Sequence, residues 1–434
     1  MEGALLHSPP PTAPTLTPNT PNTEERPPNL EQILAPGADI DADTTDISFE
    51  TLDTGSTSGP PQAGIWSKVH SGLTHFFYTT SSAFRSPSSD PTTLLSRLTS
   101  PMHPTGPITF LAAHTYPSFT DPAFLDDFRS RPWMTYRSGF EGIEGTAFTS
   151  DVGWGCMLRS GQMLLSGVLL RHLLGKDWRL SQTTTDSTTS HTHARIISMF
   201  ADTPLAPFSL HNIALLGARK FGKSVGEWFG PSTISQCLKE LVEQTPNLNL
   251  TVHIATDNTL YTSSVIRQCT SAGDDTTGDW TPVLILVPLM LGVRETNPVY
   301  FAGLKACFGI EACVGVAGGR PNSSLFFVGT AGDNVLYLDP HTVRPAVSLP
   351  DPTDEDLATY TPPQIRTISL TSLDPSLVLG FYCPTPQSFT AFTSACLGSQ
   401  VSSGGTPLFA IMEKEPEFRD RGADVDVLGD DDDF

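Results

Sequence analysis

The sequence predicts an α+β fold, with one large folded unit between two disordered ends. Three observations support this prediction. Residues 156–174 carry apolar side chains at helical spacing, residues 334–339 form a short apolar run typical of a buried strand, and both ends of the chain have strongly biased compositions. Helices and strands alternate along the part that remains, so helices are expected to pack on a sheet.

The biased ends set the limits of the folded unit. Residues 1–105 are rich in Pro, Thr and Ser and show few sustained apolar periods. Such a segment buries too little apolar surface to offset the entropy lost on ordering, so disorder is expected. The tail 413–434 holds ten acidic and three basic residues, a net charge of −7, and is expected to be disordered too. Residues 106–412 remain as one domain with ample material for a core.

Within this domain the periodicity assigns the elements in order. The Cys156 helix is apolar nearly all round, which indicates burial, and Ser209 and Ser232 are helix-start residues ahead of the next two helices. Shorter apolar runs have the length of strands. The predicted helices are 156–174, 209–219, 232–244, 297–307 and 386–397, and the predicted strands are 249–255, 283–288, 325–329, 334–339, 379–383 and 407–412.

Cys156 is the strongest candidate for a reactive residue. It follows Gly153 and Gly155, which permit a tight turn and a close approach of substrate, and it lies in the first turn of the buried helix. The positive end of the helix dipole and the unpaired amides there favour a thiolate, the form that acts as a nucleophile. The alternative is a packed core cysteine, which is the commoner situation for a free cysteine.

A thiolate needs a base, and His341 is the best placed of the eleven histidines. It follows the strand 334–339 and stands two residues after Asp339, so both side chains project from the same face of extended chain. Pro340 between them restricts the backbone. A carboxylate beside an imidazole holds its tautomer and supports its charged form. The alternative is a strand that ends in an Asp-Pro turn with an exposed histidine.

The other cysteines give no sign of a metal site. No two of the seven cysteines are spaced as CxxC, and zinc ligands usually come in such pairs with histidines nearby. Core packing is expected for most of the six besides Cys156, and no cofactor is expected. The odd number of cysteines and the lack of a signal peptide indicate a reducing compartment.

A nucleotide site is a competing interpretation. Residues 217–224 fit the pattern G-x-x-x-x-G-K-S, which cradles phosphate only when a strand precedes it and a helix starts at the lysine. Here the preceding residues favour a helix that begins near Ser209. Gly226, Gly230 and Pro231 interrupt any helix that would start at Lys223. Nucleotide binding is therefore disfavoured.

Charge and hydropathy exclude two further classes. The net charge of −21 argues against nucleic-acid binding, because phosphate contacts need a basic face. The longest apolar run, 282–293, is far shorter than the roughly 20 residues that span a bilayer.

Taken together, the Cys156 and His341 segments resemble the autophagy-related cysteine endopeptidases, which cut and delipidate a GABARAP-type ubiquitin-like modifier. Five motifs carry the resemblance in the family's order, between about residues 107 and 412. They are the nucleophile segment 153–162, the Asp-Pro-His segment 338–342, the tyrosine segment 133–137, the tryptophan segment 226–233 and the regulatory loop 315–323, whose usual Gly-Gly-Lys-Pro-Asn is Gly-Gly-Arg-Pro-Asn here. Stretches near 180–194 and 256–280 are longer than the family leads us to expect.

The resemblance implies a papain-like fold with a smaller α/β subdomain built around residues 180–265. It also implies the chemistry. Cys156 would be the nucleophile, His341 the base oriented by Asp339, and the Tyr136 hydroxyl would stabilise the oxyanion with the Cys156 amide. Trp228 and the loop with Gly319, Pro321 and Asn322 would form a narrow slot that only glycine can enter. Without the resemblance, Tyr136 and Trp228 could equally be buried aromatics, and a plain turn would be the default for Pro321.

The substrate and location are implied in the same way. The resemblance implies cleavage after a C-terminal glycine of the modifier and its release from phosphatidylethanolamine. It further implies a cytoplasmic monomer that meets autophagic membranes only through its substrate, with the nucleus and the preautophagosomal structure as further locations. A catalytically inert adaptor that binds the same modifier is the alternative from another class, and an acyl-transferring enzyme with the same residues stays open.

A short motif in the N-terminal segment indicates a second contact with the modifier. Phe49 and Leu52 are separated by two residues and have acidic residues nearby. This is the pattern of a peptide that adds a strand to a sheet edge and fills two apolar pockets. Plain solvated linker is the alternative.

Overall fold

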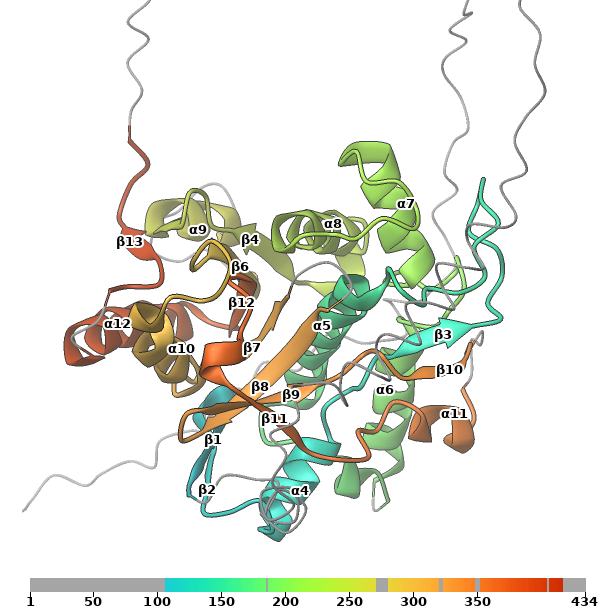
Figure 1. The fold of residues 1–434 in the computed structure, drawn as a ribbon, viewed down its shortest axis with the longest axis horizontal. Coiled ribbons are helices and arrows are strands. Elements are labelled where there is room, and N and C mark those ends of the chain that lie inside the picture. Colours follow the sequence, from blue (N-terminus) through green and yellow to red (C-terminus); the bar gives the residue numbers. More distant parts are fainter. Residues whose placement is uncertain are drawn as a thin grey trace, which may run out of the picture.

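The computed structural model describes residues 106–184, 186–270, 280–319, 323–347, 352–403 and 406–416. The expectations of disorder for residues 1–105 and for the tail from residue 417 onward lie outside these described residues. In the described part, helices surround one central sheet, as the α+β prediction requires (Figure 1).

The central sheet holds nine of the strands in the described residues. Its main path runs β11-β9-β8-β7-β12-β6-β4, and β1 adds to β8 with β2 beside it. All pairs are antiparallel except β4 with β6. The strands are β1 (Ile108–Phe110), β2 (Thr115–Tyr116), β4 (Thr251–Ile254), β6 (Val283–Met290), β7 (Cys313–Gly318), β8 (Leu325–Ala331), β9 (Asn334–Leu338), β11 (Arg366–Ser369) and β12 (Ser376–Cys383).

Two small parallel sheets complete the strands. β3 (Tyr136–Ser138) pairs with β10 (Val343–Pro345), and β5 (Thr259–Tyr261) pairs with β13 (Ala410–Met412). The first of these pairs joins the segment after His341 to the segment that carries Tyr136, which are far apart in the sequence.

Helices cover both faces of the sheet. They are α4 (Pro122–Arg129), α5 (Cys156–Leu174), α6 (Ser187–Ser198), α7 (Leu210–Lys220), α8 (Pro231–Glu243), α9 (Thr262–Cys269), α10 (Phe301–Phe308), α11 (Asp354–Ala358) and α12 (Pro386–Ser403). Neighbouring residues of β12 show the two faces. A side chain at Gly380 would meet Leu164 of α5, whereas the Phe381 ring lies 4.7 Å from that of Phe392 in α12. Successive residues of a strand point to opposite faces, so the sheet separates α5 from α12.

Helix α5 lies at the centre of the molecule (Figure 1). It packs against β7 and β8 of the sheet and against α6, α7 and α8 on its other sides. Contact on every side explains why its sequence is apolar nearly all round, as the periodicity predicted. Gly161 permits the approach to α8, because a Cβ there would lie 2.5 Å from Ile234 of that helix.

The predicted elements are present with small shifts at their ends. The Cys156 helix has the predicted bounds, and the run 297–307 becomes a 3-10 turn, Pro298–Tyr300, followed by α10. The sequence reasoning missed α4, α6, α9, α11 and strand β7, among others. Asp121 caps α4 by accepting from the amides of Ala123 and Phe124, a start signal that was overlooked.

The middle of the chain does not build a separate sheet. Residues 180–265 contribute α6, α7 and α8, but β4 joins the central sheet beside β6. The smaller subdomain expected there therefore shares the main sheet, and β5 pairs with the distant β13 instead.

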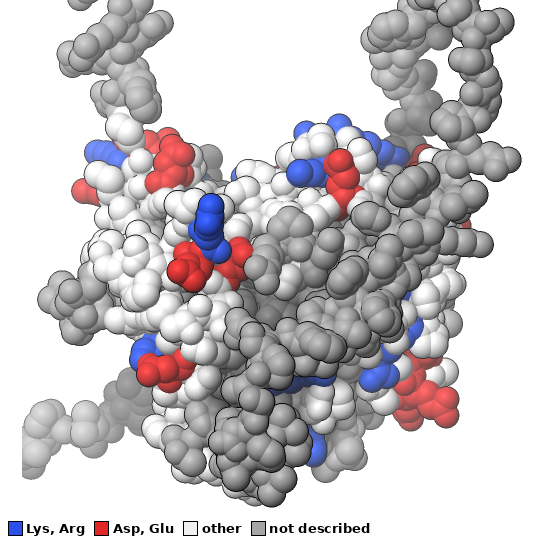
Figure 2. Space-filling model, viewed as in Figure 1, with Lys and Arg blue, Asp and Glu red and all other residues white. Residues whose placement is uncertain are grey.

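On the described part of the face seen in Figure 2, charged side chains of both signs lie in small groups. Among the described residues, exposed ion pairs of this kind join Lys176 to Glu311, Arg219 to Glu144, Lys220 to Glu240 and Lys305 to Asp333. Within the same residues, no helix has the length and hydropathy needed to cross a bilayer.

Candidate active site

Cys156 is the first residue of α5 and is fully buried. The turn before it is held by Asp151, whose main-chain carbonyl accepts hydrogen bonds from the amides of Trp154 and Gly155. Gly153 has a φ of 89°, and a Cβ at Gly155 would lie 2.4 Å from the Asp151 carboxylate. Gly153 is therefore required by its positive φ, and Gly155 by the lack of space for a side chain. The turn places the thiol at the positive end of the helix.

Asp339 and His341 lie directly after β9 and face each other. The Asp339 Oδ1 atom lies 2.6 Å from the ring Nδ1 of His341 and also accepts from the His341 amide at 3.0 Å. The guanidinium of Arg366 donates to the other carboxylate oxygen at 3.1 Å. The Asp339 carboxylate thus fixes the orientation of the imidazole and leaves Nε2 for the opposite side.

The imidazole interacts with Cys156 on that side. Burial disfavours the charged imidazole, but hydrogen bonds to Asp339 and to Cys156 outweigh this effect and raise the pKa of His341 to about 9. Burial likewise disfavours the Asp339 carboxylate, yet its hydrogen bonds with His341 hold the pKa of Asp339 below its ordinary value. The structure therefore brings Cys156, Asp339 and His341 together, with an imidazolium beside the thiol at neutral pH.

Tyr136 borders the same site through the β3–β10 pairing. Its amide donates to the Pro340 carbonyl at 2.8 Å, and its ring meets that of His341 edge to face at 5.3 Å. Burial raises the pKa of Tyr136, and the charges of Cys156 and Asp151 act in the same direction, so the phenol stays protonated. Its buried hydroxyl interacts with the Cys156 side chain and with the Gly153 main chain, so it lies beside the sulfur.

Of the other predicted site residues, the structure describes Trp228 and Gly319. Trp228 is half-buried just before α8, and its ring nitrogen is buried with no hydrogen-bond partner in the described residues. Gly319 follows β7 with a φ of 144°, and its amide donates to Ser376. The first four residues of the expected loop 315–323 are strand, not loop, because they belong to β7. Pro321 and Asn322 lie outside the described residues, as do Phe49 and Leu52.

Three further residues of the site escaped the sequence reasoning. Trp133 donates to the main-chain carbonyl of Asp339 at 2.7 Å, and Arg366 reaches the same residue from β11. Arg159, inside the nucleophile segment, pairs with Asp151 at 2.8 Å. A charged residue in the first turn of a helix predicted to be buried was the signal that could have drawn attention to Arg159.

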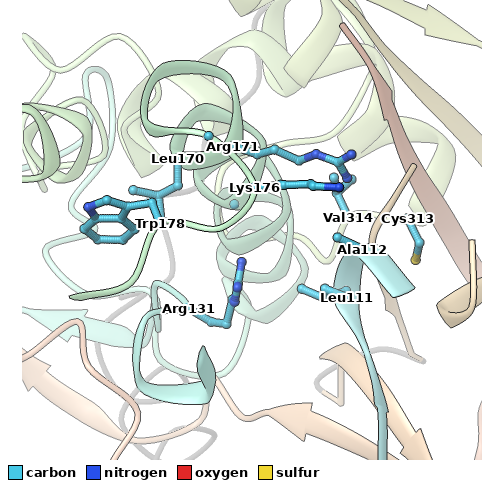
Figure 3. Close-up of a pocket in the computed structure, with 11 residues that line it drawn as sticks. Leu111, Ala112, Arg131, Leu170, Arg171, Lys176, Trp178, Cys313 and Val314 are labelled. Atoms are coloured by element: carbon cyan, nitrogen blue, oxygen red, sulfur yellow. The ribbon is translucent and has the colours of Figure 1, made fainter. Parts of the chain in front are cut away.

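Two hollows in the described residues lie at the opposite end of α5. Figure 3 shows one of about 20 Å³, which Arg171 and Lys176 line together with Arg131. A neighbouring groove of about 500 Å³ shares Arg171 and Lys176. At about 1.5 Å per residue, Arg171 lies roughly 22 Å along the helix from Cys156. These hollows therefore belong to a different part of the molecule.

The phosphate-loop pattern at residues 217–224 has the wrong context. It lies at the end of α7 rather than after a strand, and the next helix begins only at Pro231.

The six cysteines besides Cys156 are buried, and burial raises the pKa of each of their thiols. In the described residues, no group of three or more His, Cys, Asp or Glu is placed to hold a metal ion.

Comparison with known proteins agrees with this geometry. The peptidase C54 catalytic domain matches residues 121–395, a segment that contains Tyr136, Cys156, Asp339 and His341. The chain is 36% identical to cysteine protease ATG4B of Gallus gallus over 339 residues, which cover 71% of this chain and 84% of the relative.

Two other relatives give similar values. Cysteine protease ATG4A of Bos taurus is 34% identical over 318 residues, 67% of this chain and 78% of the relative. Cysteine protease atg4 of Emericella nidulans is 39% identical over 285 residues, 60% of this chain and 69% of the relative. By sequence and by its papain-like α+β fold, this chain belongs to the peptidase C54 family, the autophagy-related cysteine endopeptidases.

Proposed function

We propose that this cysteine peptidase cleaves a GABARAP-type ubiquitin-like modifier after its C-terminal glycine and also releases the modifier from phosphatidylethanolamine. The observation that carries the proposal is the joint placement of Cys156, His341 and Asp339 in one buried site. An inert adaptor would have no use for a cysteine held beside an imidazolium.

The first chemical step is acyl transfer to sulfur. The Cys156 thiolate attacks the glycine carbonyl, and an imidazolium at His341 supplies the proton that the leaving amine takes. Asp339 keeps Nδ1 occupied, so Nε2 is the atom that exchanges the proton. Water then attacks the thioester with His341 as base, which frees the glycine carboxylate and restores the thiol.

The oxyanion formed in both steps needs donors. The Cys156 amide is one of the unpaired amides at the start of α5, and the Tyr136 hydroxyl is a buried donor beside the Cys156 side chain. Loss of one such donor typically costs a factor of about 10² to 10³ in kcat. The proposal assigns both donors to the oxyanion.

Selectivity for glycine follows from the depth of the site. Cys156 has no exposed surface, and the side chains of His341 and Asp339 are only 6% and 11% exposed. An acyl group must therefore enter through a narrow opening, which a residue without a side chain can pass. In this proposal Trp228, Gly319, Pro321 and Asn322 border that opening.

The leaving group is outside the buried part of the site. A peptide amine and the amine of phosphatidylethanolamine both leave an identical glycyl thioester, so one site serves both reactions. The enzyme would act as a cytoplasmic monomer that contacts autophagic membranes through its substrate, with the nucleus and the preautophagosomal structure as further locations. Phe49 and Leu52 would add a second contact with the modifier.

Substitution of the nucleophile tests the proposal. Wild-type protein should cleave a modifier precursor after its glycine and release the lipid-linked modifier from vesicles, whereas Cys156→Ala should bind the precursor without cutting it. Gel assays of both substrates and a pull-down with the precursor measure these outcomes. Cys269→Ala, a buried cysteine in α9, is the control and should keep full activity. Cleavage by the Cys156→Ala variant would contradict the mechanism.

A further inference from the structure

A group of four buried charges lies behind the catalytic residues and takes no part in the chemistry described above. Arg137, Asp151, Arg159 and Asp202 have exposed fractions of 0 to 1%. Two are cations and two are anions, so the group is neutral as a whole. Charged side chains are almost never fully buried unless they are paired, and these are paired with one another.

The contacts connect the four residues in a closed ring. Arg159 reaches Asp151 at 2.8 Å and Asp202 at 2.9 Å. Arg137 closes the ring, because its amide donates to Asp151 at 2.7 Å and its guanidinium lies 3.9 Å from Asp202. We call these four residues the charge ring.

The charge ring touches each segment that carries a residue of the proposed mechanism. Arg137 is the neighbour of Tyr136 in β3, and its guanidinium donates to the Pro345 carbonyl at the end of β10. Asp151 and Arg159 lie on either side of Cys156 along the chain. The hydrogen bonds of Arg137 and Arg159 to Asp151, and of Arg137 to the Pro345 carbonyl, measure 3.3 Å or less.

Asp202 connects the ring to the strand that follows His341. Its carboxylate accepts from the Val347 amide at 3.0 Å, and its own amide donates to the Val347 carbonyl at 2.7 Å. Val347 follows β10, which begins two residues after His341. Through Asp202 and Arg159, the His341 segment is therefore tied to the first turns of α5.

Stability alone is a weak explanation for such a group. Desolvation of buried ions offsets most of their attraction, and well-packed apolar residues often replace buried ion pairs without loss of stability. What an apolar cluster lacks is direction, because it does not fix which atoms face each other. Hydrogen bonds to charged groups do fix this, and here they join Arg159 to Asp151 and the Val347 amide to Asp202.

We propose that Asp202 and Arg159 are positioning residues for the cysteine peptidase reaction, which set the placement of His341 relative to Cys156 through the charge ring. Neither residue touches the substrate. The inference rests on the Cys156–His341 pair and not on the identity of the modifier. One of its readouts therefore needs no substrate.

Asp202→Asn is the test variant. Asparagine keeps the shape and can still accept from the Val347 amide, but the charge that faces Arg159 is lost. We expect kcat to fall by about 10- to 100-fold with KM within about twofold, since small misplacements of reacting groups cost rates of this order. The rate at which iodoacetamide alkylates Cys156, followed by peptide mapping across pH, should fall by a similar factor.

Asp127→Asn is the matched control. Asp127 is also fully buried and pairs with two arginines, Arg131 and Arg179, but it lies on α4 and its partners carry no catalytic group. Both variants are expected to lower the unfolding temperature. Only Asp202→Asn should lower kcat and the alkylation rate in the temperature range where both proteins are folded.

Two outcomes decide the matter. Equal losses of thermal stability in the two variants, with kcat and alkylation unchanged in both, would show that the charge ring only supports the fold. If Asp202→Asn does not fold, Arg159→Lys replaces it, because lysine keeps the charge but cannot reach both carboxylates in the same way. A normal kcat and pH profile for folded Arg159→Lys would likewise overturn the proposal.

If cleavage of the modifier fails while alkylation responds as expected, the substrate assignment is at fault and not the charge ring.

Discussion

At the scale of single residues, spacing in the sequence translates directly into contacts. Asp339 and His341 are two residues apart after a strand, but the backbone is not extended there as the sequence predicts. A turn at Pro340 and His341 brings the two side chains to hydrogen-bond distance, and the Asp339 carboxylate accepts from the His341 amide within that turn. Cys156 is different, since its partner lies 185 positions further along the chain. Only the packing of α5 against the sheet could bring the two together.

The raised pKa of His341 makes a prediction about pH. The imidazolium is lost as pH rises through about 9, so kcat/KM should fall on the alkaline side near that value. The folded pKa also exceeds the ordinary value of about 6.5. The charged His341 therefore stabilises the fold fully below about pH 6.5, and this contribution is lost as pH rises through about 9.

Asp339→Asn tests the cause of that pKa. Loss of the carboxylate removes the strongest interaction that raises the pKa of His341, so the alkaline fall of kcat/KM should move to lower pH. The rate should drop by about 10² to 10⁴-fold, because the ring loses the group that holds its tautomer. Asp333→Asn, an exposed carboxylate 88% accessible at its side chain, should change neither. An unchanged profile in Asp339→Asn would mean that another group controls it.

At the scale of elements, α5 is the helix on which the site depends. Two of its glycines look alike in the sequence and differ in the structure. A Cβ at Gly161 would lie 2.5 Å from Ile234 of α8, whereas nothing lies within 4 Å of one at Gly167. Gly161 is therefore needed for helix packing, and Gly167 is an ordinary weak point of a helix.

A pair of alanine variants separates these roles. Gly161→Ala should destabilise the protein by about 1–3 kcal/mol, because the added methyl group pushes α8 away from α5. Gly167→Ala should be neutral or stabilise by up to about 1 kcal/mol through helix propensity alone. Urea unfolding followed by circular dichroism gives both values. Similar effects at the two positions would contradict the packing of α5 and α8 described here.

At the scale of the whole molecule, the surroundings of one cysteine thiol differ from those of the other six. All seven thiols are free and buried in the described residues. Burial raises the pKa of the six thiols outside the site, so they stay protonated and unreactive at neutral pH. Cys156 alone has an imidazolium beside it.

Thiol chemistry on the intact protein tests this difference. At pH 7.5, iodoacetamide should modify Cys156 first and the other six only as the protein unfolds, which intact-mass spectrometry can follow. The Cys156→Ala variant should then take up almost no label while folded. Rapid labelling of that variant would show that another thiol is activated.

Local patterns in the sequence were enough to predict the local parts of this protein. Periodicity predicted α5 and most strands of the sheet. Glycine, proline and the spacing of Asp339 and His341 indicated the local surroundings of each reactive side chain. Both kinds of signal act over a few residues, so they can be read from the sequence. Strand β7 and helix α6 were missed, since Gly315 and Gly318 interrupt the one pattern and Thr and Ser dominate the other.

The contacts between segments that are distant in the sequence are known only from the three-dimensional structure. The approach of His341 to Cys156, the parallel pairing of β3 with β10, the contact of Arg366 with Asp339 and the charge ring all join residues distant in the sequence. No local pattern encodes such pairings, because they arise from the packing of many elements around one sheet at once. The reactive groups could be named from the sequence, but their meeting is a property of the fold.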